Sequence, residues 1–285
     1  MANCNQHFLT FSKRISVNRT RGKRLQGSRR MVESAMRSFF KNNTDLGTPQ
    51  FKLQGSYKFK TTVLDWYADH DIDLGMYFKT IPVIKPNTLM QYVYGIGKDL
   101  TWYGAEHKMK CVQVFFRDEY SIDLPIYCLD KRKRRWMLAT KKGWERTDPQ
   151  GFNNWLAEKR DAKGQLIRIV KYFKMWASKQ NFKTPKGIAL MVWVAKHYVS
   201  MTRDDVAFVL TLKRLHNSLR KRPLCKMPVI PFDNLLRDLN KRQVYKFIIG
   251  LEKLVKGGGK ALKKDGQIEA ILLWRDLLGE YFPAR

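Results

Sequence analysis

Cysteine is scarce in this chain of 285 residues, with four thiols at positions 4, 111, 128 and 225. They are widely separated and form no Cys-x-x-Cys pair, so the sequence predicts neither a disulfide framework nor a structural zinc site. We expect reduced, mostly buried thiols of an intracellular protein. With 44% hydrophobic residues at this length, the chain can bury a sizeable core without such cross-links.

Long apolar runs are lacking as well. Residues 1–24 contain no apolar region of the secretory type, and no later stretch reaches the roughly 20 uninterrupted apolar residues that a membrane span needs. We therefore expect a soluble, cytoplasmic protein with no membrane partner.

Acidic residues are few relative to basic ones. The chain has 25 Asp and Glu against 55 Lys and Arg, a formal net charge of +30. Such a charge attracts polyanions, including nucleotides, RNA and DNA. The cations gather within residues 19–30, 131–142 and 220–222. Each run alone is typical of a solvated surface, and the total indicates an anionic partner.

The hydrophobic periodicity of the first half predicts one helix and several strands. Residues 71–78, 111–116 and 121–127 alternate apolar and polar side chains, as strands do, and the last two form a hairpin. Residues 21–40 have the period of a helix, with an apolar stripe of Leu25, Met31, Ala35, Met36 and Phe39.

The second half has helical periodicity. We predict helices over 165–179, 187–200, 204–219, 232–258 and 268–282, with Gly257–Gly259 marking a turn. The first should bury one face and leave Arg168, Lys171 and Lys174 on another. The predicted class is α+β, with a lobe at 1–160 that includes the N-terminal helix and a helical lobe at 161–285.

Three aspartates fall on the polar faces of the predicted strands. Asp71 and Asp73 share one face of the strand at 71–78, and Asp123 lies opposite the apolar side of the strand at 121–127. Carboxylates on adjacent strands suit two hard divalent cations, Mg²⁺ or Mn²⁺. Two such ions suit phosphoryl transfer, in which one activates a hydroxyl and the other neutralises the leaving pyrophosphate.

Gly55 and Ser56 precede these strands in a short loop. Glycine lets the backbone approach a ligand closely, and backbone N–H groups with the Ser56 hydroxyl can hold a triphosphate. An Asp-x-Asp pair by itself is usually a polar strand face or a turn. The loop, the pair and the third aspartate in this order favour a two-metal phosphoryl-transfer site over that interpretation.

These motifs resemble the cGAS/DncV-like nucleotidyltransferases, or CD-NTases, of the DNA polymerase beta superfamily. The segments that carry the resemblance are LQGSYKFKT, DHDIDLGMY and YSIDLPIY. Weaker similarity continues through GWERTDPQGFNNWLAEK, LIRIVKYFKMW and IEAILLWRDLLGEYFP, and thus over nearly the whole chain. The resemblance implies a polymerase-beta-like lobe with a mixed β-sheet packed against a C-terminal helical lobe that closes the active-site cleft.

The resemblance also implies a role for each motif residue. Gly55 and Ser56 would form the nucleotide-holding loop, which Gln54 and Tyr57 flank and shape. Lys171 would contact the triphosphate. The catalytic and metal-binding triad, holding two Mg²⁺ or Mn²⁺ ions, would be Asp71, Asp73 and Asp123.

The family's activity is the joining of nucleoside triphosphates into cyclic di- or trinucleotide second messengers, with release of pyrophosphate. The resemblance therefore implies ATP as a substrate, with GTP or a pyrimidine triphosphate as further candidates. It also implies anti-phage signalling, in which a downstream effector binds the product. No His-rich or Cys-rich insertion is present, so we do not expect the zinc-dependent DNA sensing of the animal enzyme.

Two alternatives stay open. A template-independent RNA or tRNA nucleotidyltransferase would share the aspartates, and the +30 charge suits a long RNA acceptor. A noncatalytic RNA-binding module would not require three aspartates.

The positive charge exceeds what one triphosphate and two metal ions require. We therefore hypothesise a nucleic-acid activator, a structured RNA or other nucleic acid, that docks on a basic surface. The expected contacts are Arg21, Lys23, Arg24, Arg29 and Arg30, with the Lys131–Arg135 run.

Overall fold

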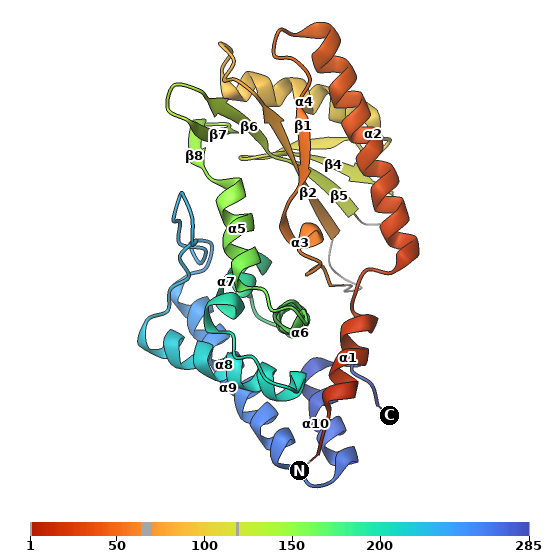
Figure 1. Cartoon of the computed structure of the whole chain (residues 1–285), viewed down its shortest axis with the longest axis vertical. Helices are drawn as coiled ribbons and strands as arrows, with labels where there is room; N and C mark the ends of the chain where they lie inside the picture. The colour runs from red at the N-terminus through yellow and green to blue at the C-terminus, as the bar shows by residue number, and fades with distance from the viewer. Residues whose placement is uncertain (1, 64–69, 118–119, 285) are drawn as a thin grey trace. The chain divides into compact units, whose positions relative to one another are not determined.

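The computed structural model describes residues 2–63, 70–117 and 120–284, and the side chains of Arg19, His70 and Asp71 lie outside this description. The chain divides into two compact units (Figure 1). The sheet unit comprises residues 17–62 and 70–151, and the helical unit comprises residues 2–16, 63 and 152–284.

Within the described residues, the sheet unit forms an eight-stranded mixed sheet. Its strands are β1 (Gln50–Leu53), β2 (His70–Phe78), β3 (Ala105–His107), β4 (Val112–Phe116), β5 (Tyr120–Leu124), β6 (Ile126–Asp130), β7 (Arg135–Thr140) and β8 (Gly143–Thr147). The order is β3-β4-β5-β2-β6-β7-β8, with β1 paired to β2. β2 runs parallel to β5 and β6, so the predicted mixed sheet is confirmed.

Apolar side chains of the central strands form the core of this unit. Ile72, Leu74, Met76 and Phe78 on β2 are at most 1% exposed, as the alternation predicts. Two long helices, α2 (Arg19–Asn43) and α4 (Pro86–Leu100), lie beside the sheet in Figure 1. They add Leu25, Val32, Met36, Phe40, Leu89, Met90 and Val93 to the same cluster.

The helix predicted over residues 21–40 is longer than expected and has a different buried face. Asn18 caps α2 by accepting a hydrogen bond from the Arg21 N–H at 2.8 Å, so the helix begins at residue 19. The predicted stripe included Met31, which is 42% exposed, and omitted Val32, which is 0% exposed. The prediction of the stripe was wrong there, because Leu25, Val32, Met36 and Phe40 keep the helical repeat better.

The strand predicted over residues 121–127 is two strands. Pro125 has no N–H to give to a ladder, and β5 ends at Leu124 while β6 begins at Ile126. The Pro125 carbonyl still accepts a hydrogen bond from the Met76 N–H at 2.9 Å. The same stretch therefore extends along both halves of β2, first as β5 and then as β6.

The helical unit contains six helices within the described residues and shares a seventh with the sheet unit. These are α1 (Asn5–Arg14), α6 (Gln165–Ser178), α7 (Gly187–His197), α8 (Asp204–Lys221), α9 (Lys241–Lys263) and α10 (Gln267–Leu278), with α5 (Pro149–Lys159) crossing the division. A four-residue helix, α3 (Gly55–Lys58), belongs to the sheet unit.

The division between the units differs from the predicted boundary at residue 160. It lies between residues 151 and 152, and residues 2–16 belong to the helical unit. The reason is aromatic packing: Phe8 and Phe11 of α1 are fully buried. They contact Tyr172, Phe208, Trp274 and Phe282 of the helical unit.

α6 is buried nearly all round, which differs from the predicted amphipathic helix. Lys171, which was expected on the unburied face, is 7% exposed. The helix lies among α1, α7, α8 and α10, so most of its circumference meets protein. A helix surrounded in this way has little polar face to offer solvent.

The glycines at 257–259 lie inside α9, so the predicted turn there was wrong. A Cβ on Gly257 would lie 2.8 Å from Leu277, and one on Gly258 would lie 2.8 Å from both Trp274 and Val209. These glycines let α8 and α10 approach α9 closely. The helix starts at residue 241, later than predicted, because Asn240 and Gln243 form a capping box.

All four cysteines are free, and Cys4, Cys128 and Cys225 are buried. The prediction of mostly buried thiols is confirmed. None of the helices within the described ranges is long and apolar enough to cross a membrane.

Candidate active site

Two of the three predicted aspartates meet on neighbouring strands of the sheet unit. β2 and β5 are parallel, with Asp73 in register with Asp123 and Asp71 in register with Ser121. Register partners on adjacent strands are about 4.8 Å apart and point to the same face. The backbone thus brings Asp73 and Asp123 together, while the Asp71 side chain lies outside the described part of the chain.

Gly55 approaches the Asp73 carboxylate more closely than any other residue type could. Its φ is +59°, and a Cβ there would lie 1.7 Å from the Asp73 Oδ2 atom. The approach is fixed by the Gln54 N–H, which donates to the Asp73 carbonyl at 2.8 Å. The first residue of α3 therefore lies directly against one predicted metal ligand.

The Gln54 side chain is held between two tyrosines. Its Nε2 donates to the Tyr77 hydroxyl at 2.5 Å, and its Oε1 accepts from the Tyr127 hydroxyl at 3.1 Å. Burial raises the pKa of Tyr77 to about 12 and raises that of Tyr127 further. Both tyrosines stay protonated at neutral pH and hold the start of the loop.

Ser56 is tied to the chain that follows α3. Its hydroxyl lies 3.0 Å from the Thr62 hydroxyl, and its carbonyl accepts a hydrogen bond from the Thr61 N–H at 2.9 Å. Tyr57, the next residue, is partly buried against the core of the sheet unit. These contacts give the loop a defined shape.

Cys111 lies beside the two carboxylates and was not among the predicted site residues. Burial, followed by the charge of Asp123, raises the pKa of the Cys111 thiol to about 12, with a smaller effect of Asp73. The thiol donates a hydrogen bond to Asp123. It remains protonated at neutral pH and supports that carboxylate.

The donor set fits a hard divalent cation. Asp73 and Asp123 offer carboxylate oxygens from adjacent strands, which is the ligand type that Mg²⁺ prefers. Among the side chains that the structure describes, no three His, Cys, Asp or Glu gather as a metal-binding group. The third predicted ligand, Asp71, is not among those side chains.

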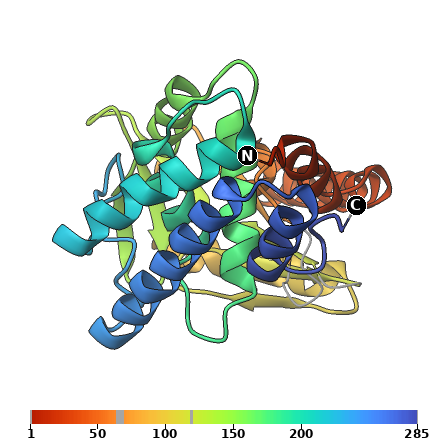
Figure 2. The same ribbon diagram turned by 90° about the horizontal axis from the view of Figure 1, so that it is seen from below.

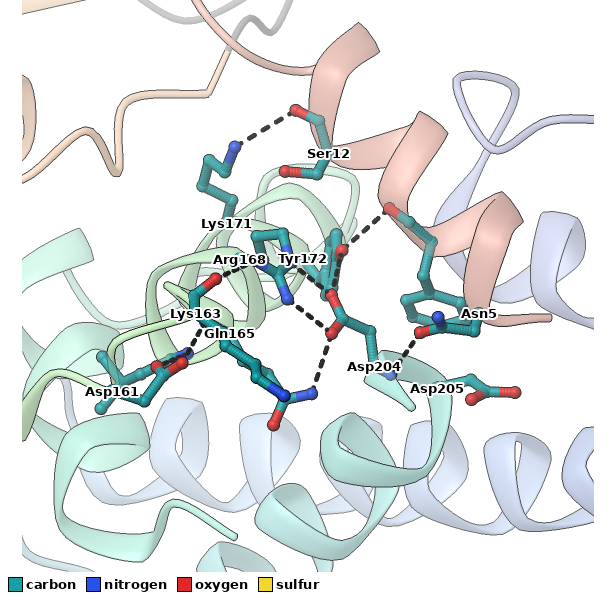
Figure 3. A network of polar contacts seen from close by, with 12 residues as sticks. Asn5, Ser12, Asp161, Lys163, Gln165, Arg168, Lys171, Tyr172, Asp204 and Asp205 are labelled. Carbon is teal, nitrogen blue, oxygen red and sulfur yellow. Dashed lines mark hydrogen bonds and ion pairs between the residues drawn. The ribbon is translucent and has the colours of Figure 1, made fainter. Parts of the chain in front are cut away.

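Lys171 lies in the helical unit, where its ammonium contacts α1. It donates to the Ser16 hydroxyl at 2.7 Å and to the Ser12 carbonyl at 3.2 Å, the latter drawn in Figure 3. Burial, together with the charge of Arg168, lowers the pKa of Lys171 to about 8. The prediction that Lys171 lies on a different face from the buried one is therefore wrong, because its side chain is itself buried.

A buried carboxylate organises the same region (Figure 3). Asp204 accepts hydrogen bonds from Arg168 at 2.6 and 2.9 Å, from Gln165 at 2.9 Å and from Tyr172 at 2.8 Å. Although burial raises the pKa of Asp204, the bonds from Arg168, Gln165 and Tyr172 bring it below its usual value. The network joins α6 to the first turn of α8, and Asn5 of α1 accepts from the Asp204 N–H.

The sequence offered a signal for only some of the residues that shape the site. Tyr77 shares the polar face of β2 with Asp73, because the two are four residues apart on a strand. Tyr127, Thr62 and Cys111 reach the site through chain folding, and no local pattern marks them.

The geometry of the sheet unit defines a class. A loop held against the first of two paired carboxylates on a mixed sheet is the arrangement expected of a nucleotidyltransferase. Residues 49–127, which include all the site residues of this unit, match the nucleotidyltransferase domain described as cyclic GMP-AMP synthase DncV-like. These residues are therefore similar to the nucleotidyltransferase domain of the cGAS/DncV-like group, and the predicted resemblance is confirmed.

Two curated relatives are cyclic nucleotide synthases. A cyclic GMP-AMP synthase of Escherichia albertii is 28% identical over 200 residues, which are 63% of this chain and 44% of the relative. A cyclic AMP-AMP-AMP synthase of Acinetobacter sp. (strain ATCC 27244 / 9458) is 28% identical over 150 residues, which are 49% of this chain and 44% of the relative. The matched part is thus less than half the length of either relative.

Solved structures share the fold over nearly the whole chain. Vibrio cholerae DncV cyclic AMP-GMP synthase in complex with nonhydrolyzable GTP superposes with a TM-score of 0.85 at 16% identity, covering 99% of this chain and 97% of that one. Escherichia coli DncV in a 3'-deoxy GTP bound form gives 0.77 at 16% identity, covering 95% and 94%. The predicted α+β nucleotidyltransferase fold is confirmed.

Proposed function

We propose that this protein joins nucleoside triphosphates into a cyclic di- or trinucleotide and releases pyrophosphate. The observation that carries the proposal is the meeting of Gly55, Asp73 and Asp123 within the matched domain. The names of the two curated relatives favour ATP as one substrate, with GTP as a candidate second substrate. The role of the product in anti-phage signalling, through an effector that binds it, stays a prediction from the resemblance.

Asp71, Asp73 and Asp123 would hold two Mg²⁺ or Mn²⁺ ions. Bound there, the ions would supply activation of the attacking hydroxyl and neutralisation of the leaving pyrophosphate. The protein's own part is to fix the carboxylates. Asp73 is held by the backbone at Gly55, and Asp123 is supported by the Cys111 thiol.

The loop that follows β1 would hold the triphosphate. We propose that the backbone of Gly55 and Ser56 and the Ser56 hydroxyl contact the phosphates, while Gln54 and Tyr57 fix the loop's shape. Lys171 is proposed as a further triphosphate contact. For that contact, its ammonium would exchange its bonds to the Ser12 carbonyl and the Ser16 hydroxyl for bonds to phosphate oxygens.

Product analysis tests this function. The full chain is incubated with the four ribonucleoside triphosphates and Mg²⁺ or Mn²⁺, treated with phosphatase, and examined by mass spectrometry. Phosphatase-resistant cyclic species that disappear when EDTA is added are the expected result. Long linear RNA or an extended tRNA 3′ end would instead indicate a template-independent polymerase or tRNA nucleotidyltransferase, and RNA binding without any product would indicate a noncatalytic module.

The proposed activator site on α2 retains several exposed cations. Lys23, Arg24 and Arg30 are exposed, as are residues 131–134. Arg21 is half-buried, and Arg29 pairs with Glu33 at 2.6 Å. We propose that a structured RNA docks there and raises turnover. Turnover that is high without nucleic acid, and indifferent to charge reversal on α2, would count against it.

A further inference from the structure

A row of basic side chains runs along one face of α9. At 100° per residue, its six members lie within about a third of the helix circumference. At a rise of 1.5 Å per residue, the row extends for about 32 Å. All six side chains are exposed, and we call them the α9 basic row: Arg242, Lys246, Lys253, Lys256, Lys260 and Lys263.

The α9 basic row carries little compensating negative charge. Glu252 pairs with Lys256 at 2.7 Å, and its pKa is lowered chiefly by that hydrogen-bonded lysine. The other five cations form no ion pair with any residue in the described ranges. The charge of Arg220 on α8 also lowers the pKa of Glu252. Figure 2 shows α8 and α9 side by side. The row is therefore strongly positive.

The face lacks the apolar area that a membrane-bound helix needs. Its exposed large apolar residues are Tyr245, at 65%, and Ile249, at 37%. The apolar stripe of α9, including Phe247, Leu251 and Leu254, is buried in the helical unit. An interfacial helix inserts such a stripe into the bilayer, and here the protein already covers it.

We propose that the α9 basic row binds the phosphate backbone of duplex RNA. Its length of about 32 Å is close to one turn of a duplex. Five of its six members are lysines, whose ammonium groups contact phosphates as compact point charges. The wide major groove of B-form DNA admits a helix whose side chains hydrogen-bond to base edges. Double-stranded RNA is instead recognised mostly by its shape and its backbone. A single exposed aromatic, Tyr245, offers little platform for stacked single-stranded bases.

Fluorescence anisotropy of a labelled 20-base-pair RNA duplex tests the proposal at several salt concentrations. The full chain is compared with a variant carrying Lys246→Glu, Lys253→Glu and Lys260→Glu. The matched control carries Lys79→Glu, Lys85→Glu and Lys98→Glu, which are exposed lysines of the sheet unit. Both variants undergo the same change in net charge, and circular dichroism verifies that both are folded.

We expect the α9 variant to bind the RNA at least ten-fold more weakly than the control does. Its log–log salt slope should be shallower by about 2.7, because each phosphate contact contributes about 0.9. Equal weakening in both triple variants would overturn the proposal. So would a selective loss of binding to duplex DNA of the same length, or to phosphatidylserine vesicles, with RNA binding unchanged. Because binding is measured without turnover, these results are independent of whether the protein is a cyclic nucleotide synthase.

Discussion

Gly55 is the residue on which the geometry of the site depends most. Its position combines φ of +59° with a contact in which an added Cβ would lie 1.7 Å from the Asp73 Oδ2 atom. We expect Gly55→Ala to displace the Asp73 carboxylate and to lower turnover by about 100-fold or more, since a misplacement of 1 Å can cost that much. Steady-state rates of cyclic product formation measure the effect.

Gly47→Ala is the matched control. Gly47 has a similar φ of +70°, but nothing lies within 4 Å of its added Cβ. Both variants should lose about 1 kcal/mol of unfolding free energy from the left-handed backbone, while Gly47→Ala keeps its activity. Similar turnover in the two variants would show that the Gly55–Asp73 approach is unimportant for the reaction.

Cys111 is predicted to be a positioning residue for Asp123. Loss of its hydrogen bond in Cys111→Ala should lower kcat by about 2- to 10-fold, the range of one net hydrogen bond. Cys111→Ser keeps a donor and should recover most of the rate. An equal loss in both variants would mean that the thiol serves packing alone.

At the residue scale, the sequence identified carboxylates and glycine but not their supports. Asp73 and Asp123 could be predicted because strand alternation fixes the face on which each lies. Cys111 and Tyr127 could not, because each reaches the site from another strand or loop through the sheet's pairing. Lys171 was named from the resemblance, yet its burial against α1 depends on a helix that the sequence analysis did not predict.

At the scale of elements, the contact between α6 and α1 should respond to pH. Burial lowers the pKa of Lys171 from 10.5 to about 8, so the folded state releases the proton first as pH rises. The penalty of burying the charge is complete below pH 8 and is relieved between pH 8 and 10.5. Relative to Lys171→Met, the unfolding free energy of the wild type should therefore rise by roughly 3 kcal/mol across that window.

Urea unfolding of both proteins at several pH values measures this difference. Other titrating groups, apart from the neighbouring Arg168 and Asp204, contribute equally to both proteins and cancel. A difference that stays constant from pH 7 to 10.5 would contradict the burial of a charged ammonium at this contact.

Two adjacent glycines of α9, Gly258 and Gly259, should differ in their response to substitution. In Gly258→Ala, the new Cβ would lie 2.8 Å from the buried side chains of Trp274 and Val209, and overpacking typically costs about 1–3 kcal/mol. Gly259 has nothing within 4 Å, so Gly259→Ala should stabilise the protein by about 0.4–1 kcal/mol. Thermal unfolding of both variants provides the comparison, and a shift of the same sign in both would contradict the account of helix packing.

Some helices and strands could be located from the sequence more accurately than others. Strands with strict alternation and helices with long apolar stripes were located, because burial on one face imposes a period. Gly257–Gly259 suggested a turn because clustered glycines usually mark one. The close approach of neighbouring helices to Gly257 and Gly258 is visible only in three dimensions. Pro125 interrupts a continuous alternation, and the alternation alone did not show that it separates two strands.

At the scale of the whole molecule, the sheet unit follows from its own motifs, whereas the division between units does not. Residues 2–16 precede the sheet unit in sequence but pack with the helical unit through Phe8 and Phe11. Such long-range aromatic contacts leave no local pattern. The charge of +30 indicated a polyanionic partner. The structure adds the α9 basic row, whose members are spread over 22 residues and form no run in the sequence.

The central claim is that the paired carboxylates of β2 and β5 carry nucleotide joining. The most direct test is cyclic product formation by Asp73→Asn, compared with Asp130→Asn, a carboxylate on β6 that lies 3.7 Å from Arg135. Each change removes one charge with little change in volume. We predict that Asp73→Asn forms no detectable cyclic product while Asp130→Asn retains near-normal turnover. Near-normal turnover by a folded Asp73→Asn would contradict the account.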